Sequence, residues 1–160
     1  MKKITLQDNR LHFTIILILI FFLSTILTSI ASSKTVVSIS PEKQLVERNQ
    51  SFTVNISIEP DAPISGAQFD FIFNKSLANI KSVQEGNMLS QNGAKTYFSN
   101  GTVDSSTGLI KHIYSSVLGN SSVSSPGILA TINMTAGSST GVAKLNLSNV
   151  VISGSGSNPV

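Results

Sequence analysis

Hydrophobic and polar residues alternate almost strictly in the stretch GAQFDFIFN, residues 66 to 74. One side of the alternation is apolar: Ala67, Phe69, Phe71 and Phe73. The other side is mostly polar: Gln68, Asp70, Ile72 and Asn74. Successive side chains of a strand point to opposite faces, so this stretch predicts a strand with one face in the core. Ile72 then stands apart, as an apolar residue on the face that its neighbours mark as solvated.

Similar runs recur along the chain at intervals of about ten residues. They predict further strands over 36–39, 52–58, 95–99, 109–115, 128–134 and 142–147. Turns are predicted between them, including Asn100–Gly101 and 104–108. Residues 77–83 have apolar side chains at the spacing of a helix, but the segment is short and contains poor helix formers, so we do not expect a helix there. The sequence predicts an all-β protein, an antiparallel β-sandwich with jelly-roll topology.

The N-terminal residues have the layout of a secretory signal. Lys2, Lys3 and Arg10 precede an uncharged apolar run from 13 to 30, and small residues suited to cleavage end at Ala31. An uncleaved anchor is the alternative, because the run is just long enough to cross the hydrocarbon core. In either case we expect a secreted or cell-surface protein, with contact to the membrane only through this segment. The predicted organisation is a signal at 1–31, one domain at 32–152 and a flexible Ser/Gly tail at 153–160.

Charge and cysteine content narrow the function further. Removing Lys2, Lys3, Arg10 and Asp8 with the signal leaves eight basic and seven acidic residues. A net charge this small gives no electrostatic support for nucleic-acid binding. The chain has no Cys, so burial of apolar side chains, without disulfides, must hold the exported domain together.

Seven N-x-[ST] sequons are consistent with export and are candidate glycosylation sites: Asn49, Asn55, Asn74, Asn100, Asn120, Asn133 and Asn146. Chance alone would give about three in a chain this rich in Ser and Thr. Asn55, Asn133 and Asn146 each lie between two apolar residues, so we expect them to point away from the core. Such placement leaves room for glycans on a cell-surface protein.

Catalytic and metal-binding chemistry finds little support in the sequence. Besides His12 in the signal, His112 is the lone histidine, which cannot build a multi-histidine zinc site and is expected to be a structural or surface residue. No Ser/His/Asp motif is present, and among the scattered acids Asp70 alone lies in the middle of a strand. The segment 104–108 has one acid and is a turn rather than a calcium loop. We therefore expect a non-enzymatic protein with no cofactor or metal of its own.

A carbohydrate-binding module is a weaker alternative. Such modules usually stack exposed aromatic rings on sugars, and this chain has no Trp and two Tyr, Tyr97 and Tyr114. Six of its eight Phe belong to the signal or to the predicted core strand. Little aromatic surface is left for a sugar platform.

The ordered set of motifs resembles a cohesin domain, the receptor module that docks dockerin modules in cellulosomes and related surface proteins. The resemblance rests on these segments in this order: VSISP at 37–41, FTVNI at 52–56, ISGAQFDFIF at 64–73, LANIKSVQEG at 77–86, TGLIKHIYSS at 107–116, GILATI at 127–132 and GVAKLNLSNV at 141–150. Each motif alone is weak, but together they cover nearly the whole exported part.

The resemblance implies that dockerins bind one face of the sandwich, formed by the strand at 66–74 and the one at 109–116. The partner-binding residues would be Gln68, Asp70, Ile72, Lys111, Ile113, Ser116, Leu118 and Gly119. Independently of the family, Ile72 and Ile113 beside an amide, a carboxylate and an ammonium group have the composition of a protein interface. Calcium is expected on the dockerin partner and not on this chain. The alternative is that these are ordinary exposed strand residues, or that glycans or a second sheet cover them.

Cohesins usually end in a strand that pairs beside the first, and no counterpart follows residues 148–159 before Val160. If that last strand is missing, 36–39 has an open edge that can pair with another chain. A fragment, a truncated gene and a strand supplied by a partner all remain open as explanations. Three functions are carried forward: a dockerin-binding module first, a structural or adhesive surface domain second, and a carbohydrate-binding module third.

Overall fold

The structure is a computed structural model that describes residues 34–154. The predicted signal at 1–31 and residues 155–160 lie outside the described part. Eight strands follow one another: β1 (Val36–Ser40), β2 (Ser51–Glu59), β3 (Ile64–Ile72), β4 (Ala78–Glu85), β5 (Thr96–Asp104), β6 (Leu109–Val117), β7 (Gly127–Ala136) and β8 (Asn146–Gly154). No helix in this part of the chain is long and apolar enough to cross a membrane.

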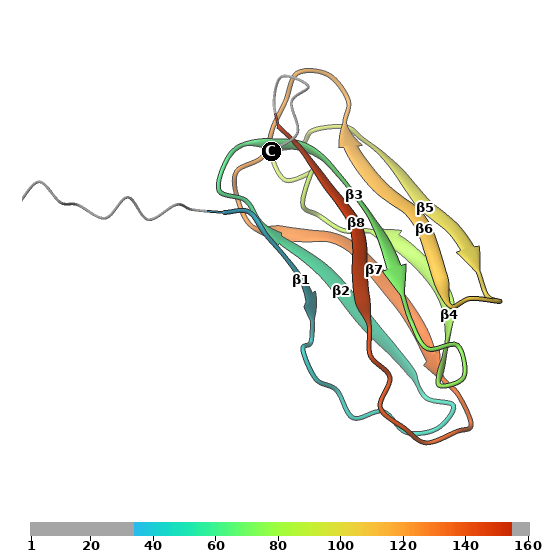
Figure 1. Cartoon of the computed structure of the whole chain (residues 1–160). Coiled ribbons are helices and arrows are strands. Elements are labelled where there is room, and N and C mark those ends of the chain that lie inside the picture. The colour runs from blue at the N-terminus through green and yellow to red at the C-terminus, as the bar shows by residue number, and fades with distance from the viewer. Residues whose placement is uncertain (1–33, 155–160) are drawn as a thin grey trace, which may run out of the picture. The chain divides into compact units, whose positions relative to one another are not determined.

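The strands form two four-stranded sheets that pack face to face (Figure 1). Sheet A has the strand order β1-β2-β7-β4, and sheet B has the order β5-β6-β3-β8. Every pair of neighbouring strands is antiparallel. The predicted all-β, antiparallel sandwich is confirmed.

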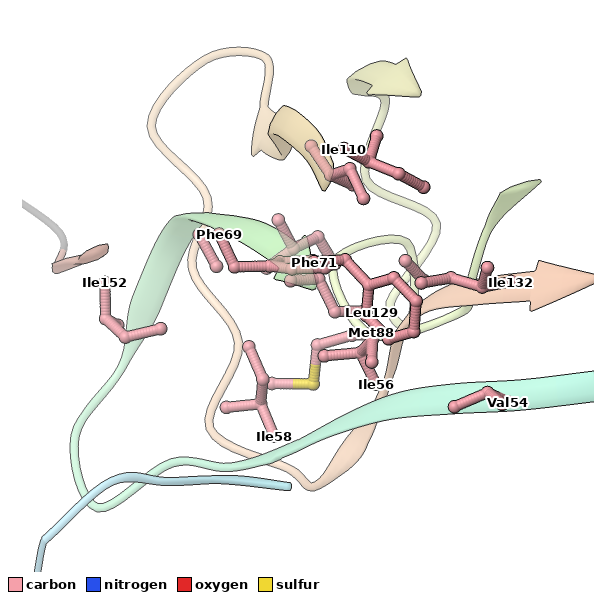
Figure 2. Packing of buried hydrophobic residues seen from close by; sticks show 14 of the residues in the cluster. Val54, Ile56, Ile58, Phe69, Phe71, Met88, Ile110, Leu129, Ile132 and Ile152 are labelled. Atoms are coloured by element: carbon pink, nitrogen blue, oxygen red, sulfur yellow. The ribbon is translucent and has the colours of Figure 1, made fainter. Parts of the chain in front are cut away.

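The alternation that predicted β2 and β3 also fills the core. Phe69 and Phe71 of sheet B and Ile56 and Ile58 of sheet A have at most 1% of their surface exposed. They meet between the sheets, as Figure 2 shows. Fully burying a side chain of this size contributes about 1.5–3 kcal/mol, which explains how a cysteine-free domain is held together.

Three segments test the sequence prediction in detail: one agrees with it and two differ. Residues 77–83 do not form a helix, as expected, and most of them belong to β4. The predicted turn at Asn100–Gly101 is wrong, because β5 continues through it with Gly101 at a φ of 76°. The strand predicted at 142–147 is shifted: β8 begins at Asn146 and extends to Gly154. Val142, which the prediction placed in the strand, is exposed and precedes it. Ser153 and Gly154 of the predicted tail therefore belong to sheet B.

The edge strand β1 has one partner in the described part of the chain. It pairs with β2 along its whole length, from Val36 opposite Glu59 to Ser40 opposite Asn55. Val37 and Ile39 pack against the core, while Val36 is half exposed. Within residues 34–154 the other edge of β1 carries no strand.

Candidate protein-binding face

The outward surface of sheet B brings together residues from four strands. Residues paired in a sheet lie side by side and point to the same face, so the register defines rows across it. Three rows follow from the pairing: Tyr97–Ser116–Gly66–Ser153, Ser99–Tyr114–Gln68–Val151, and Asp104–Leu109–Ile72–Asn146. Asp70 and the pair Lys111–His112 lie between the second and third rows. We call this surface the sheet B face.

Apolar side chains are exposed on the sheet B face. Ile72 is 38% exposed, Val151 45% and Tyr97 54%. Leu118, which directly follows β6, is also exposed. Polar and charged groups surround them, among them Gln68 and the exposed Lys111. This mixture matches protein–protein interfaces, in which apolar and aromatic anchors are set among polar groups.

The two tyrosines of the chain meet on this face, which the sequence analysis did not predict. The ring centroids of Tyr97 and Tyr114 are 5.7 Å apart with an interplanar angle of 26°. The side-chain hydrogen bond with Tyr97 raises the pKa of Tyr114 above its ordinary value of 10.0. The pair forms because β5 and β6 place Tyr97 opposite Ser116, next to Tyr114 on the same side. No local pattern in the sequence gives this register.

Asp70 lies on the sheet B face but is only 4% exposed. Its Oδ1 accepts a hydrogen bond from the backbone N–H of His112 at 2.7 Å, and its Oδ2 accepts one from the side-chain amide of Asn149 at 2.7 Å. His112 and Asn149 both have positive φ, 57° and 50°, on the strands to either side of β3. Asp70, which was predicted as a contact residue, is therefore a structural carboxylate. Its hydrogen bonds hold the irregular parts of β6 and β8 against β3.

The electrostatics of Asp70 agree with this role. Burial by itself would raise the pKa of the carboxyl group, but the hydrogen bonds from His112 and Asn149 and the nearby charge of Lys111 outweigh it. The net result is a pKa below the ordinary value of 3.8. Asp70 is thus held as a carboxylate, and each of its two oxygens accepts a hydrogen bond from within the domain.

The prediction that Ile113 points outward is wrong, because a β-bulge reverses the alternation in β6. The register with β3 pairs Phe69 with Ile113 but Phe71 with Ile110, so two residues of β6 face one residue of β3. Ile110 and Ile113 are both fully buried, and the exposed pair Lys111 and His112 occupies the bulge. Two isoleucines three positions apart in one strand were the sequence signal for this bulge.

The remaining predicted residues divide between the face and its border. Gln68, Ile72, Lys111 and Ser116 lie on the sheet B face. Leu118 and Gly119 lie in the loop after β6, where Gly119 has a φ of 98°. Val151 and Leu109 join the face and were not predicted, because β8 was placed four residues too early and Leu109 was taken only as the start of a strand.

The outward surface of sheet A has a different composition. Its side chains bond to one another across the strands: Thr53 Oγ1 donates to Asn133 Oδ1, Asn133 Nδ2 to Ser82 Oγ, and Thr131 Oγ1 to Asn55 Oδ1, each at 3.0 Å. Two sequon residues, Asn55 and Asn133, take part in this network. They point away from the core, as predicted.

Potential metal ligands do not cluster in the described residues, 34–154. No group of three or more His, Cys, Asp or Glu side chains comes together there. Asp104, at the end of β5, bonds within the following turn, since its Oδ1 accepts from the N–H and the hydroxyl of Ser106. Hydrogen bonds from Ser106 and Thr107 lower its pKa to about 2.

Comparison with known proteins decides the family. The family model of the cohesin domain matches residues 35–160. This chain belongs to the cohesin family. No curated protein matches it. The resemblance drawn from the order of the motifs is thereby confirmed.

Solved cohesins share the fold at low sequence identity. The second type II cohesin module of the adaptor scaffoldin ScaA from Acetivibrio cellulolyticus matches with a TM-score of 0.68 and 12% identity, over 80% of this chain and 84% of that one. The sixth cohesin of scaffoldin B from the same organism, in complex with a mutant Cel5 dockerin, matches with a TM-score of 0.61 and 17% identity, over 80% and 92%. A non-cellulosomal cohesin from the archaeon Archaeoglobus fulgidus matches with 0.52 and 15%, over 71% and 74%.

Proposed function

We propose that this cohesin is an exported, non-catalytic receptor that docks dockerin-bearing proteins on its sheet B face. The observation that carries the proposal is the contrast between the two outer surfaces. The sheet B face exposes Ile72, Val151 and Tyr97, whereas sheet A exposes a network of Ser, Thr and Asn with Val36 at its edge. Burying exposed apolar area is the main driving force of protein association, so the sheet B face has more to gain from a partner.

The residues of the face have distinct parts in this proposal. Ile72, Leu109 and Val151 would supply the apolar contact, and Gln68 and Lys111 the polar contacts around it. Asp70 would act indirectly, by holding the bulges of β6 and β8 in the shape on which the partner docks. Calcium belongs to the dockerin, whose fold requires the metal, and not to this chain.

The test is a capture experiment with the full-length chain in mild detergent and exported proteins of the source organism. We expect a dockerin-bearing protein to be captured with calcium and lost with a chelator. Ile72→Ser should abolish capture. Thr131→Ser is the matched control, because it also changes one outward strand residue but on sheet A, and it should leave capture unchanged. Capture that ignores the chelator and Ile72→Ser would overturn the proposal. Retention on polysaccharide, lost with Tyr97→Ala, would favour the carbohydrate-binding alternative.

A structural or adhesive role is the second candidate, and the open edge of β1 favours it. Along Val36–Ser40 the backbone groups that do not pair with β2 face a side that carries no strand within the described residues. An unpaired edge is a template for another strand. Ser38→Pro removes one N–H on β1, and a loss of self-association in that variant with dockerin capture intact would assign the edge to this second role.

Glycosylation is proposed for the sequons that lie on exposed sites. Asn146 is the one with the largest consequence, because it is paired with Ile72 on the sheet B face and is exposed. A glycan there would stand beside the proposed apolar contact. Mass spectrometry of the protein from its source, before and after Asn146→Gln, would detect it.

A further inference from the structure

A shallow hollow lies in the sheet B face above Gly66. Its volume is about 220 Å³, and Gly66, Gln68, Tyr114, Ser116, Val151 and Ser153 line it. The register explains its shape, since Gly66 is flanked by Ser116 on β6 and Ser153 on β8. The small residues Gly66, Ser116 and Ser153 form the floor of the hollow. The larger side chains of Tyr114 and Val151, in the next row, form one wall.

Glycine at this position is not required by the fold. Gly66 is not among the residues with positive φ, and a Cβ there would find its nearest neighbour, the carbonyl oxygen of Ser115, at 3.4 Å, an ordinary contact. By contrast, a Cβ on Gly86 would come within 2.0 Å of the carbonyl oxygen of Ile128. The register of β3 with β8 shifts between Ile64 and Gly66, but the φ of Gly66 is not positive, so this irregularity does not require a glycine there.

A glycine inside a strand destabilises the fold relative to Ala, because its backbone loses more conformational freedom on folding. At Gly66 no gain in backbone geometry offsets this cost. Glycine in a strand interior also marks places where a ligand or another backbone approaches closely. We therefore attribute the glycine at position 66 to the hollow above it, which a large side chain would fill.

The chemistry of the lining selects the occupant. None of the residues that line the hollow is charged, so a charged side chain would lose its hydration without gaining an opposite charge. Small-molecule pockets usually have volumes of about 300–1,000 Å³, larger than this hollow. One large apolar side chain matches the size and the wall of Tyr114 and Val151. Gln68, Ser116 and Ser153 remain to hydrogen-bond the backbone around it.

We propose that the hollow above Gly66 is a specificity pocket that receives one large apolar side chain of the docked dockerin. The inference rests on the proposed function and adds a determinant of partner choice to it. Anchor side chains that fill a pocket near the centre of an interface carry much of the binding energy. Dockerins that present a charged side chain at that point would be rejected by the same pocket.

The test compares Gly66→Leu, which fills the hollow, with Ser57→Leu, which adds the same bulk to an outward strand residue of sheet A. The probe is the dockerin module captured by the wild-type chain, and affinities are measured by calorimetry with calcium. We expect Gly66→Leu to weaken binding about 30-fold or more, and Ser57→Leu to leave it within about threefold. Gly66→Ala, which adds a single methyl group, should fold at least as stably as the wild type.

A second measurement covers the case in which Gly66→Leu disturbs the fold. Each large apolar side chain on the dockerin surface is replaced by Ala, and we expect one of these variants to lose binding to the wild type. Combined with Gly66→Leu, that variant should lose little more, as a double-mutant cycle of two contacting sites requires. If Gly66→Leu binds normally while Ile72→Ser does not, the face docks a dockerin and the pocket is refuted. If the wild type binds no dockerin, the proposed function fails and the pocket with it.

Discussion

On the outer surface of sheet A, Asn133 accepts a hydrogen bond from Thr53 and donates one to Ser82, whereas on the sheet B face Ile72 and Val151 are left exposed. The first surface already pairs several of its polar groups with one another, and a partner would have to desolvate them. The second surface gains about 25 cal/mol for each Å² of apolar area that a partner covers. Two sheets of one sandwich thus differ in what their outer side chains can gain from contact.

The largest loss of stability is expected at Asp70, beneath the sheet B face. Asp70→Asn keeps the shape but sets a side-chain NH₂ against one of the two donors, His112 N–H or Asn149 Nδ2. Hydrogen bonds to a buried charge are worth about 1.5–3 kcal/mol each, so we expect the free energy of unfolding to fall by about 3 kcal/mol. Urea denaturation measures it. Asp104→Asn, at an exposed turn, is the matched control and should cost clearly less; equal losses would contradict the structural role of Asp70.

The pH dependence of stability should show the same carboxylate. The pKa of Asp70 in the folded state lies below its unfolded value of 3.8, so the folded state binds fewer protons. The carboxylate therefore stabilises the fold above about pH 4, and this contribution is lost as the pH falls through the folded-state pKa. We expect the stability difference between wild type and Asp70→Asn to shrink below pH 4 in urea titrations. A difference that stays constant down to pH 2 would contradict the lowered pKa.

A smaller loss is expected from the polar network of sheet A. Asn133→Ala removes one hydrogen bond from Thr53 and one to Ser82, each worth about 1 kcal/mol net, so we expect about 1–2 kcal/mol. Because the change is on the other sheet, dockerin binding should be unchanged within about threefold. Loss of binding in this variant, at a temperature where it is folded, would remove the distinction between the two surfaces.

The smallest change in stability is expected from Ile72→Ser, which should lower the free energy of unfolding by less than about 1 kcal/mol because the side chain is 38% exposed and outside the core. The same variant should give the largest loss of dockerin binding. Thermal unfolding and calorimetry on one preparation check both halves. A larger loss of stability than this in Ile72→Ser would indicate that Ile72 supports the fold instead of contacting a partner.

The sequence was sufficient for the sandwich because its core strands follow a local rule. Every second residue of β2, and of β3 from Ala67 to Phe71, is apolar, and Val54, Ile56, Phe69 and Phe71 are buried as that alternation requires. The face was predicted less well because its bulges depend on contacts between distant strands. Asp70 stabilises positive φ at His112, 42 positions away, and at Asn149, 79 positions away, and no local pattern reports these pairings.

The same limit explains the other residues that were misplaced or missed. Ile113 was assigned to the wrong face because strict alternation was carried through the bulge of β6. Tyr97 and Tyr114 meet only through the register of β5 with β6. Val151 was missed because the last strand was predicted at 142–147, where apolar residues also alternate, and this prediction ended before Val151. That the strands at 66–74 and 109–116 lie side by side could be predicted, while the side chains that they direct outward could not.

The central claim is that the sheet B face, and not the outer surface of sheet A, contacts the dockerin. The chain has no cysteine, so a single thiol can be placed on either surface. Gln68→Cys and Ser57→Cys are matched, since both residues are half-buried, lie within a nine-residue strand and point outward. A maleimide reagent measures the exposure of each thiol with and without saturating dockerin and calcium. The account predicts that dockerin slows modification at position 68 about tenfold or more and leaves position 57 unchanged; protection at 57, or at neither position, would contradict it.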